Sequence, residues 1–251
     1  MARKETSEAD FGFRKVAPEE HTRLVRGVFD SVAKRYDLMN DLMSGGVHRL
    51  WKSALIERLA PRPGQTLLDV AGGTGDIARR FLDRAGMGSS AIICDLNESM
   101  LRQGRDRALD HGRLAGVEFV CSNAESLPVA SASVDAYTIA FGLRNVTRIP
   151  EALAEARRVL KPGGRFLCLE FSQVATPWLK RAYDLYSFQV LPRLGAWVAG
   201  DRESYQYLVE SIRRFPSRAR LVALMEAAGL EQASARPLSG GIAALHSGWR
   251  L

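Results

Sequence analysis

The stretch LLDVAGGTGD, residues 67–76, reads as a buried strand that runs into a glycine-rich turn. Glycine has no Cβ, so such a turn lets the backbone approach a nucleotide closely. Read as G-x-G-x-x-A, the residues Gly73, Gly75 and Ala78 also satisfy the loose dinucleotide fingerprint. The stretch therefore predicts a turn that binds an adenosine-containing ligand, and it leaves the identity of that ligand open.

Around this turn, strand patterns and helix patterns alternate along the chain. Helices are predicted over residues 75–85, 98–110, 149–159 and 217–228, and strands over 66–70, 90–95, 117–121, 134–140, 164–171, 230–236 and 240–247. Strands that alternate with helices at this spacing predict a doubly wound α/β fold. We therefore expect a mostly parallel, Rossmann-like sheet of seven strands, of which the last two segments form a closing pair.

The flanking segments add to this core without forming a second domain. Residues 1–21 are polar and are expected to be a mobile N-terminal segment, so the single domain is expected to span 22–251. The spacing of apolar residues predicts N-terminal helices within 22–60. The aromatic-rich segment 174–207 is too long for a structureless loop in a compact domain, and we expect it to form a helical lid over a substrate. The alternative is that its aromatic residues only pack helices together.

Composition and charge narrow the choice of partners. The 251-residue chain is 46% hydrophobic, and its net charge of +7 favours an anionic partner, either nucleic acid or a lipid surface. The basic residues are dispersed, so an equally good interpretation is that they only keep the protein soluble. The charged N-terminus is unlike a signal peptide, and no apolar run reaches about 18 residues. We therefore expect a cytoplasmic protein that is at most peripheral to a membrane.

The three cysteines give no support for a metal centre. Cys94, Cys121 and Cys168 form no C-x-x-C pair, so no metal site is predicted. Each lies inside or at the end of an apolar run, where free cysteine behaves as a small hydrophobic residue. All three are expected in the core.

Acidic residues near the glycine turn decide between ligands. Asp95 ends the second predicted strand and can accept both ribose hydroxyls of a dinucleotide or of a methyl donor. Asp69 ends the first strand, where it opposes a pyrophosphate but suits the ammonium and sulfonium groups of S-adenosylmethionine. S-adenosylmethionine is therefore the expected ligand. Asp76 either adds to this negative charge or only caps the helix and complements its dipole. The alternative for Asp69 is that it is a buried structural acceptor.

Further motifs carry a resemblance to known enzymes. RRVLKPGGRFLCLEF (157–171) resembles class I methyltransferases in general, and FGLRNVT (141–147) is more specific. With LLDVAGGTGD, these motifs closely resemble the menaquinone and ubiquinone biosynthesis C-methyltransferase family. The same holds for VFDSVAKRYDLMNDLMSGGVHRLWK (28–52), DLNESML (95–101), LEFS (169–172) and YDLYSFQVLPRLG (183–195). The resemblance covers the chain from about residue 22 to its C-terminus.

The resemblance implies where S-adenosylmethionine is held. In that family the donor lies at the positions of Thr74, Asp95, Asn123 and Ala124, and also just before the FGLRN motif. Relatives often have serine at the last position, where this chain has Ala140, so one hydroxyl contact is missing. With the carboxylate and glycines of the turn, the expected donor site is Asp69, Gly73, Thr74, Gly75, Asp95, Asn123, Ala124 and Ala140.

The resemblance also implies a reduced quinone as methyl acceptor, either a polyprenyl-methoxybenzoquinol or demethylmenaquinol. A ring carbon is a poor nucleophile until a neighbouring hydroxyl loses its proton, so the site needs a base or a water and a group that stabilises the oxyanion. Arg144 is the expected cation, with Asn145 beside it, and His48 is a candidate base. The alternatives are that Arg144 braces its turn through backbone carbonyls and that His48 is structural.

A polyprenyl tail requires an apolar groove that opens to a membrane. Tyr36, Tyr183 and Phe188 are the expected substrate contacts, although Tyr36 fits helix packing equally well. Basic residues near the lid are expected to bring the protein transiently to an anionic membrane surface, and these are Arg181, Arg193, Arg202 and Arg213.

Three rival classes stay open. An NAD-dependent oxidoreductase is supported only by the loose glycine pattern and is opposed by Asp69. A nucleic-acid methyltransferase would need a basic stripe with interleaved aromatic residues, which the chain lacks, so we expect no nucleic-acid partner. A donor-binding scaffold that stabilises other quinone-biosynthesis enzymes fits as well. The sequence leaves open the quinol branch, the tail length and the oligomeric state.

Overall fold

The structure is a computed structural model that describes residues 8–32, 41, 44–174, 181, 185 and 202–251. The expected substrate contacts Tyr36, Tyr183 and Phe188 lie outside the described residues, as does most of the expected lid at 174–207. The features below concern the described part of the chain.

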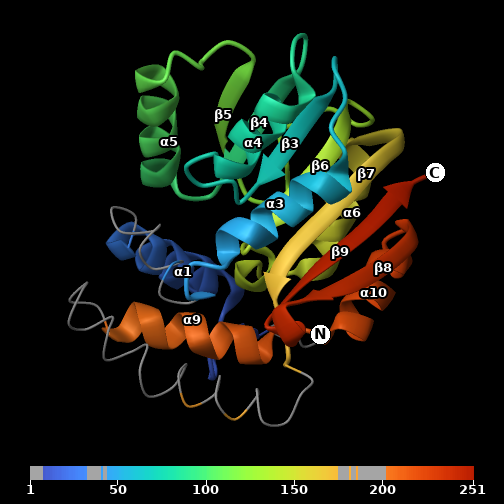
Figure 1. Cartoon of the computed structure of the whole chain (residues 1–251). Coiled ribbons are helices and arrows are strands. Elements are labelled where there is room, and N and C mark those ends of the chain that lie inside the picture. Colours follow the sequence, from blue (N-terminus) through green and yellow to red (C-terminus); the bar gives the residue numbers. More distant parts are fainter. Residues whose placement is uncertain (1–7, 33–40, 42–43, 175–180, 182–184, 186–201) are drawn as a thin grey trace, which may run out of the picture.

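A seven-stranded sheet forms the centre of the protein (Figure 1). Its strands are β3 (Thr66–Val70), β4 (Ser90–Asp95), β5 (Val117–Cys121), β6 (Val134–Ala140), β7 (Leu160–Phe171), β8 (Glu231–Leu238) and β9 (Ala243–Arg250). Their order across the sheet is β5-β4-β3-β6-β7-β9-β8. The strands from β5 to β7 are parallel, whereas β9 runs antiparallel to both β7 and β8. The expected doubly wound, mostly parallel α/β fold is confirmed.

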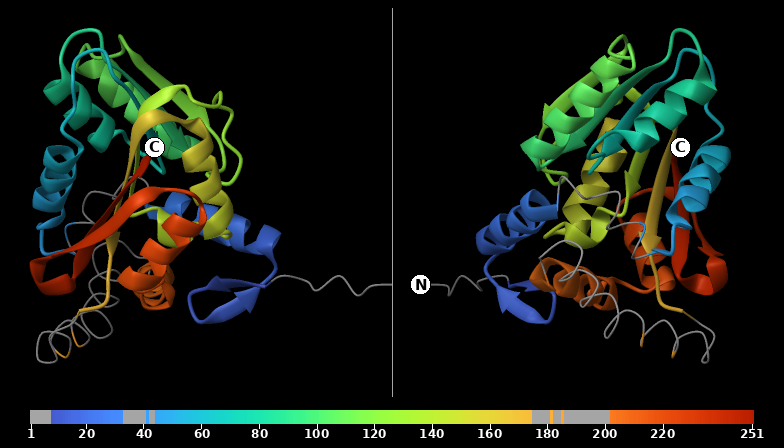
Figure 2. Two further views of the ribbon diagram at one scale, coloured as in Figure 1. Left: turned by 90° about the vertical axis from the view of Figure 1, so that its right-hand side faces the viewer. Right: turned by 60° about the vertical axis from the view of Figure 1, so that its left-hand side comes forward.

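Helices cover both faces of this sheet (Figure 2). One face carries α3 (His48–Leu59), α4 (Asp76–Ala85) and α5 (Glu98–Asp110), and the other carries α6 (Ile149–Val159) and α10 (Arg218–Ala227). Successive strand residues point to opposite faces, so Leu67 packs in the first layer and Leu68 in the second, both fully buried. Complete burial of one leucine side chain stabilises the folded state by about 1.5–3 kcal/mol. Because helices cover both faces of the sheet, this central strand is apolar on both sides.

The burial of each cysteine depends on the position of its strand in the sheet rather than on the local sequence. Cys94 and Cys168 are fully buried, as expected. Cys121 is exposed, so its expected place in the core is wrong. The reason is that β5 lies at the edge of the sheet, where no further strand covers its last residue.

The described N-terminal residues begin with a short hairpin. From residue 8 the chain forms β1 (Ala9–Phe11) and β2 (Arg14–Val16), and then α1 (Pro18–Val32). The ring of Phe11 stacks on Tyr207 of α9 (Arg202–Arg214), with centroids 4.2 Å apart. Figure 2 shows the hairpin beside α9 in both views. Strands of three residues are too short for an alternating pattern to predict them.

A buried histidine in β9 makes stability depend on pH. His246 is 1% exposed, and burial lowers its pKa from 6.5 to about 4. Between those values the unfolded chain binds the extra proton, so stability is complete above about pH 6.5 and is lost as the pH falls toward 4. We expect the His246→Gln variant to lack this part of the acid loss, worth up to about 3 kcal/mol. Urea denaturation of both proteins from pH 4 to 7.5 measures the difference in unfolding free energy. Curves of stability against pH that run parallel for the two proteins would contradict the prediction.

Candidate active site

One carboxylate holds the glycine turn between β3 and α4 against β4. The N–H of Gly73 donates to Oδ2 of Asp95 at 2.9 Å, and the N–H of Asn97 donates to Oδ1 at 2.8 Å. Gly75 has a φ of 80°, and a Cβ there would approach Ile93 to 2.8 Å. Conformation and space therefore both require glycine. Because a carboxylate has about four acceptor positions, Asp95 keeps capacity for a ligand hydroxyl pair.

A cavity, called the donor cavity below, opens beside this turn at the carboxyl ends of β3 and β4. Its walls come from the turn, from α1, and from the loops that follow β4, β5 and β6. Among the expected site residues, the structure brings together five around it: Gly73, Asp95, Asn123, Ala124 and Asn145. This is the edge where the ligand of a doubly wound fold is expected.

The other expected donor residues lie elsewhere. Thr74 and Gly75 line a second cavity on the opposite side of the turn, between α4 and α5. Ala140 is buried at the end of β6 and lines neither of the two cavities in the described part of the chain. The donor cavity is thus built from one side of the turn only.

Asp69 lies underneath the turn. It is 1% exposed, and its Oδ1 accepts a hydrogen bond from the hydroxyl of Thr138 at 2.7 Å. Oδ2 has no hydrogen-bond partner among the described residues. Burial raises the pKa of this carboxyl to about 7. The contact with Thr138 fits the structural interpretation, while the high pKa makes the ionised form sensitive to a nearby positive charge.

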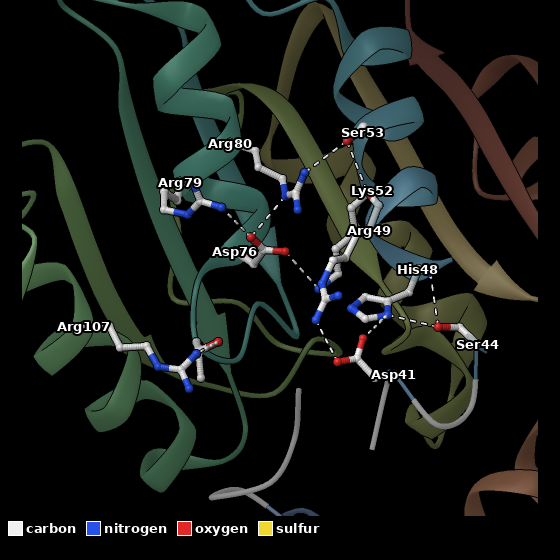
Figure 3. A network of polar contacts seen from close by, with 11 residues as sticks. Asp41, Ser44, His48, Arg49, Lys52, Ser53, Asp76, Arg79, Arg80 and Arg107 are labelled. Atoms are coloured by element: carbon white, nitrogen blue, oxygen red, sulfur yellow. Dashed lines mark hydrogen bonds and ion pairs between the residues drawn. The ribbon is translucent and has the colours of Figure 1, made fainter. Parts of the chain in front are cut away.

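Asp76 does not face the donor cavity but joins two helices (Figure 3). Its carboxylate binds Lys52 of α3 at 3.0 Å, Arg79 at 2.9 Å and Arg80 at 3.1 Å. Burial acts to raise the pKa of Asp76, but Lys52 and Arg80 outweigh it and hold the pKa well below its usual range. Asp76 is therefore a permanent anion that ties α3 to the start of α4.

The loop after β6 makes a second close approach to the glycine turn. Phe141 has a φ of 58°, and a Cβ on Gly142 would lie 2.3 Å from the Cβ of Ala71. Ala71 has a φ of 51°. Backbone in this region costs about 1–3 kcal/mol for a residue with a side chain, so the surrounding contacts must hold both positions.

Those contacts include a buried ion pair. Nη1 of Arg144 donates to the carbonyl of Phe141 at 2.6 Å and to Oε1 of Glu170 at 2.7 Å. The two side chains are 1% and 0% exposed. Burial raises the pKa of Glu170, and the guanidinium of Arg144 opposes this shift. Arg144 lies in the short helix η2 (Leu143–Asn145), and its side chain does not line the donor cavity. The geometry thus favours bracing of the loop over contact with a substrate.

Asn145 belongs to this loop and, together with Thr147, lines the donor cavity. The buried hydroxyl of Tyr207 donates to Oδ1 of Asn145 at 3.0 Å, and Nδ2 of Asn145 lies 3.5 Å from the carbonyl of Phe141. Burial raises the pKa of Tyr207, so its hydroxyl stays a donor. Nearby, Nδ1 of His21 lies 2.8 Å from the hydroxyl of Thr147. Helices α1 and α9 therefore position the loop from outside the sheet.

His48 lies away from the donor cavity. It is 4% exposed, its Nδ1 lies 3.0 Å from the hydroxyl of Ser44, and it lines the cavity between α4 and α5 (Figure 3). Burial lowers its pKa. This placement fits a structural histidine better than a base that acts on the acceptor ring.

Sequence reasoning missed the wall that α1 contributes. Thr22, Val25, Arg26 and Phe29 all line the donor cavity. Their spacing of three and four residues places them on one face of the helix. In the sequence, such a face predicts only packing against the core. No residue type there signals a ligand.

The donor cavity suits S-adenosylmethionine in its chemistry. Asp95 can accept the ribose hydroxyls, and Asn123 with the backbone of Ala124 can meet the adenine edge. The cavity encloses about 90 Å³, less than the roughly 300–1,000 Å³ usual for such ligands. A bound donor therefore needs more room than the described walls enclose.

The fold is that of class I, S-adenosylmethionine-dependent methyltransferases. A solved structure of a SAM-dependent methyltransferase from Aquifex aeolicus is 17% identical, with a TM-score of 0.59, over 80% of this chain and 89% of that chain. The [4+2]-cyclase SpnF is 21% identical, with a TM-score of 0.65, over 88% of this chain and 76% of that chain. At these identities the likeness concerns the fold alone, and one fold can host several reactions.

The sequence comparisons identify the family. The sequence model of the ubiE/COQ5 methyltransferase family matches residues 15–250. A relative from Paracoccus denitrificans is 58% identical over 100% of both chains, and one from Methylobacterium nodulans is 60% identical over 100% of both. Both are named ubiquinone/menaquinone biosynthesis C-methyltransferase UbiE. This chain belongs to the ubiE/COQ5 methyltransferase family and is an S-adenosylmethionine-dependent C-methyltransferase, which confirms the expected family and methyl donor.

The position of Asp95 predicts a strong effect on donor binding. We expect Asp95→Ala to weaken S-adenosylmethionine binding by about 2–3 kcal/mol, because two hydrogen bonds to a charged acceptor are lost. Asp106→Ala, which removes an exposed carboxylate from α5, is the matched control and should bind normally. Calorimetry measures both, and unchanged affinity in Asp95→Ala would remove Asp95 from the donor site.

The hydroxyl of Tyr207 predicts a smaller, selective effect. Tyr207→Phe keeps the ring that stacks on Phe11 but frees the amide of Asn145 to rotate. We expect kcat to fall about three- to tenfold, the equivalent of one hydrogen bond, with donor affinity unchanged. Tyr205→Phe, at another buried tyrosine of α9, is the control. Equal kcat losses in the two variants would show that α9 packing, and not the amide, is responsible.

Proposed function

We propose that this protein transfers a methyl group to a ring carbon of a polyprenyl quinol in ubiquinone or menaquinone biosynthesis. The observation that carries the proposal is full-length identity of 58–60% with relatives that bear that name. The position of a neutral amide, Asn145, in the wall of the donor cavity supports it. S-adenosylmethionine, when bound, supplies an electrophilic methyl group, and the residues of the chain must orient the acceptor toward it.

The described residues divide this work between binding and positioning. Asp95, Asn123 and Ala124 hold the nucleoside, and the buried carboxylate of Asp69 favours the positive charge of the donor. Asn145 offers an N–H to the ring oxygen as that oxygen loses its proton, which stabilises the developing phenolate. Arg144 acts through the loop as a positioning residue. A base or a water must take the proton of the ring hydroxyl.

Membrane contact follows from the tail of such a substrate. No helix among the described residues is both long and apolar enough to cross a membrane. An enzyme that acts on a polyprenyl quinol must reach the lipid surface where the quinol resides. We propose transient binding to an anionic membrane face, and Tyr36, Tyr183 and Phe188 remain the proposed contacts of the substrate.

Two measurements test the substrate. Mass spectrometry of quinone intermediates in cells that lack this protein should reveal a demethylated polyprenyl quinol, and the ring that accumulates identifies the branch. Purified protein should then methylate a short-tail version of that quinol, with no other protein present. Normal quinones in the deleted cells would overturn the proposal, and activity only with partner enzymes would support the scaffold interpretation.

Variants of the loop after β6 separate chemistry from bracing. We expect Asn145→Ala to fold and bind the donor but to lose about 10²–10³ in kcat, as one oxyanion donor is removed. Arg144→Ala should lose about 3–5 kcal/mol of stability, because Glu170 is left buried without its partner.

The paired substitution Arg144→Met with Glu170→Leu supplies the control. Replacement of a buried ion pair by apolar residues of similar volume is often neutral for stability, so this variant should fold. If Arg144 only braces the loop, its kcat stays within about tenfold of the parent. A loss of 10² or more in a folded double variant, which shrinks at high pH as the quinol ionises unaided, would instead place Arg144 on the ring oxygen.

A further inference from the structure

The cavity between α4 and α5, called the α4–α5 cavity below, is separate from the donor cavity. It has a volume of about 400 Å³, and none of the described residues lines both this cavity and the donor cavity. It lies on the far side of the glycine turn, with α3 and α4 forming one wall and α5 the other. Figure 3 shows polar residues of α3 and α4 that line it, together with Arg107 of α5.

Its polar lining is strongly cationic. Six arginine and lysine residues line it against one carboxylate, that of Asp76, and these are Arg49, Lys52, Arg79, Arg80, Arg107 and Arg113. Two acidic residues outside the lining also reach these cations. Asp41 binds Arg49 at 2.7 Å, and Asp83 binds both Arg79 and Arg113. Among the described residues, these three carboxylates face six cations, which leaves an excess of positive charge on a concave surface, where the field is focused.

The floor of the same cavity is apolar. Ala78 and Leu82 of α4, Ile93 of β4, and Val117 and Phe119 of β5 line it. A site for a free inorganic anion would be polar throughout, because an apolar floor offers such an ion nothing in exchange for its hydration. A cationic rim over an apolar floor matches a molecule with an anionic head and an apolar body.

We propose that the α4–α5 cavity binds the phosphate of an anionic phospholipid, with the start of its acyl portion against the apolar floor. This inference rests on the proposed function, because a methyltransferase whose acceptor lies in a bilayer gains from a fixed orientation on that surface. Arg79 and Arg113 are two of the exposed cations that line the cavity, and Asp83 competes with the lipid phosphate for both. Each such arginine contributes about tenfold or less to binding of an anionic surface.

The experiment measures flotation of the full-length protein with vesicles. Phosphatidylglycerol mixed with phosphatidylcholine should hold the parent protein, and pure phosphatidylcholine should not. The variant Arg79→Gln with Arg113→Gln should bind the anionic vesicles about thirtyfold more weakly. Asp83→Asn should have the opposite effect and bind them more tightly, because it releases the same two arginines. Added salt should reduce binding of the parent more than that of the double variant.

A matched control separates the site from overall charge. Arg220→Gln with Arg236→Gln removes the same charge from exposed positions on α10 and β8, at the other end of the sheet. This variant should float like the parent. Equal losses in the two double variants would show that net charge alone attracts the protein, which would overturn the proposal. An Asp83→Asn variant that binds anionic vesicles no more tightly than the parent would overturn it as well.

Two further measurements are needed. One identifies which phosphate-containing ligand binds, and the other separates a failure of the lipid site from a failure of the proposed function. If calorimetry with inorganic phosphate or with RNA shows binding that depends on Arg79 and Arg113 while flotation does not, the ligand is not a lipid and the proposal fails. Methylation of a short-tail quinol without vesicles is measured on the same proteins. A parent without that activity refutes the proposed function, whereas an active parent whose flotation ignores these arginines refutes only the lipid site.

Discussion

The buried pair of Arg144 and Glu170 is the interaction on which the donor side of the molecule depends. It joins the end of β7 to the loop after β6, and the same guanidinium holds the carbonyl of Phe141, whose φ of 58° would otherwise relax. That loop presses against the glycine turn and carries Asn145 into the cavity wall. A buried polar group that lacks a hydrogen-bond partner costs free energy. This buried cluster is therefore stable in one position of the loop rather than in several.

The parts of this arrangement that follow a local rule were predictable from the sequence. Alternating strand and helix patterns place Asp95 at a strand end, and a parallel sheet then brings that end beside the glycine turn. In the short segment from β3 to α4, the apolar run predicts the strand and the glycines that follow predict the turn. The family resemblance added Asn123 and Ala124, which an ordinary polar turn does not distinguish by residue type alone.

What could not be predicted depends on contacts between distant segments. Arg144 looks like a free cation in the sequence, and only the register of β7 against β6 puts Glu170 within reach of it. The hairpin before α1 gains its order from Tyr207, almost two hundred residues away. Cys121 reads as a core residue until the strand order places β5 at the edge. Pairings of this kind have no signature in a single sequence window.

The glycine turn also divides two electrostatic environments that the sequence presents as one acidic cluster. Asp69 lies beneath it with a pKa of about 7, and Asp76, a few residues later, is held ionised by Lys52 and Arg80. Burial dominates at the first carboxylate, and neighbouring cations dominate at the second. The donor side can therefore respond to a positive ligand, whereas the opposite side keeps a fixed excess of positive charge. One turn thus separates the site of the cationic donor from the site proposed for an anionic lipid, only a few residues away.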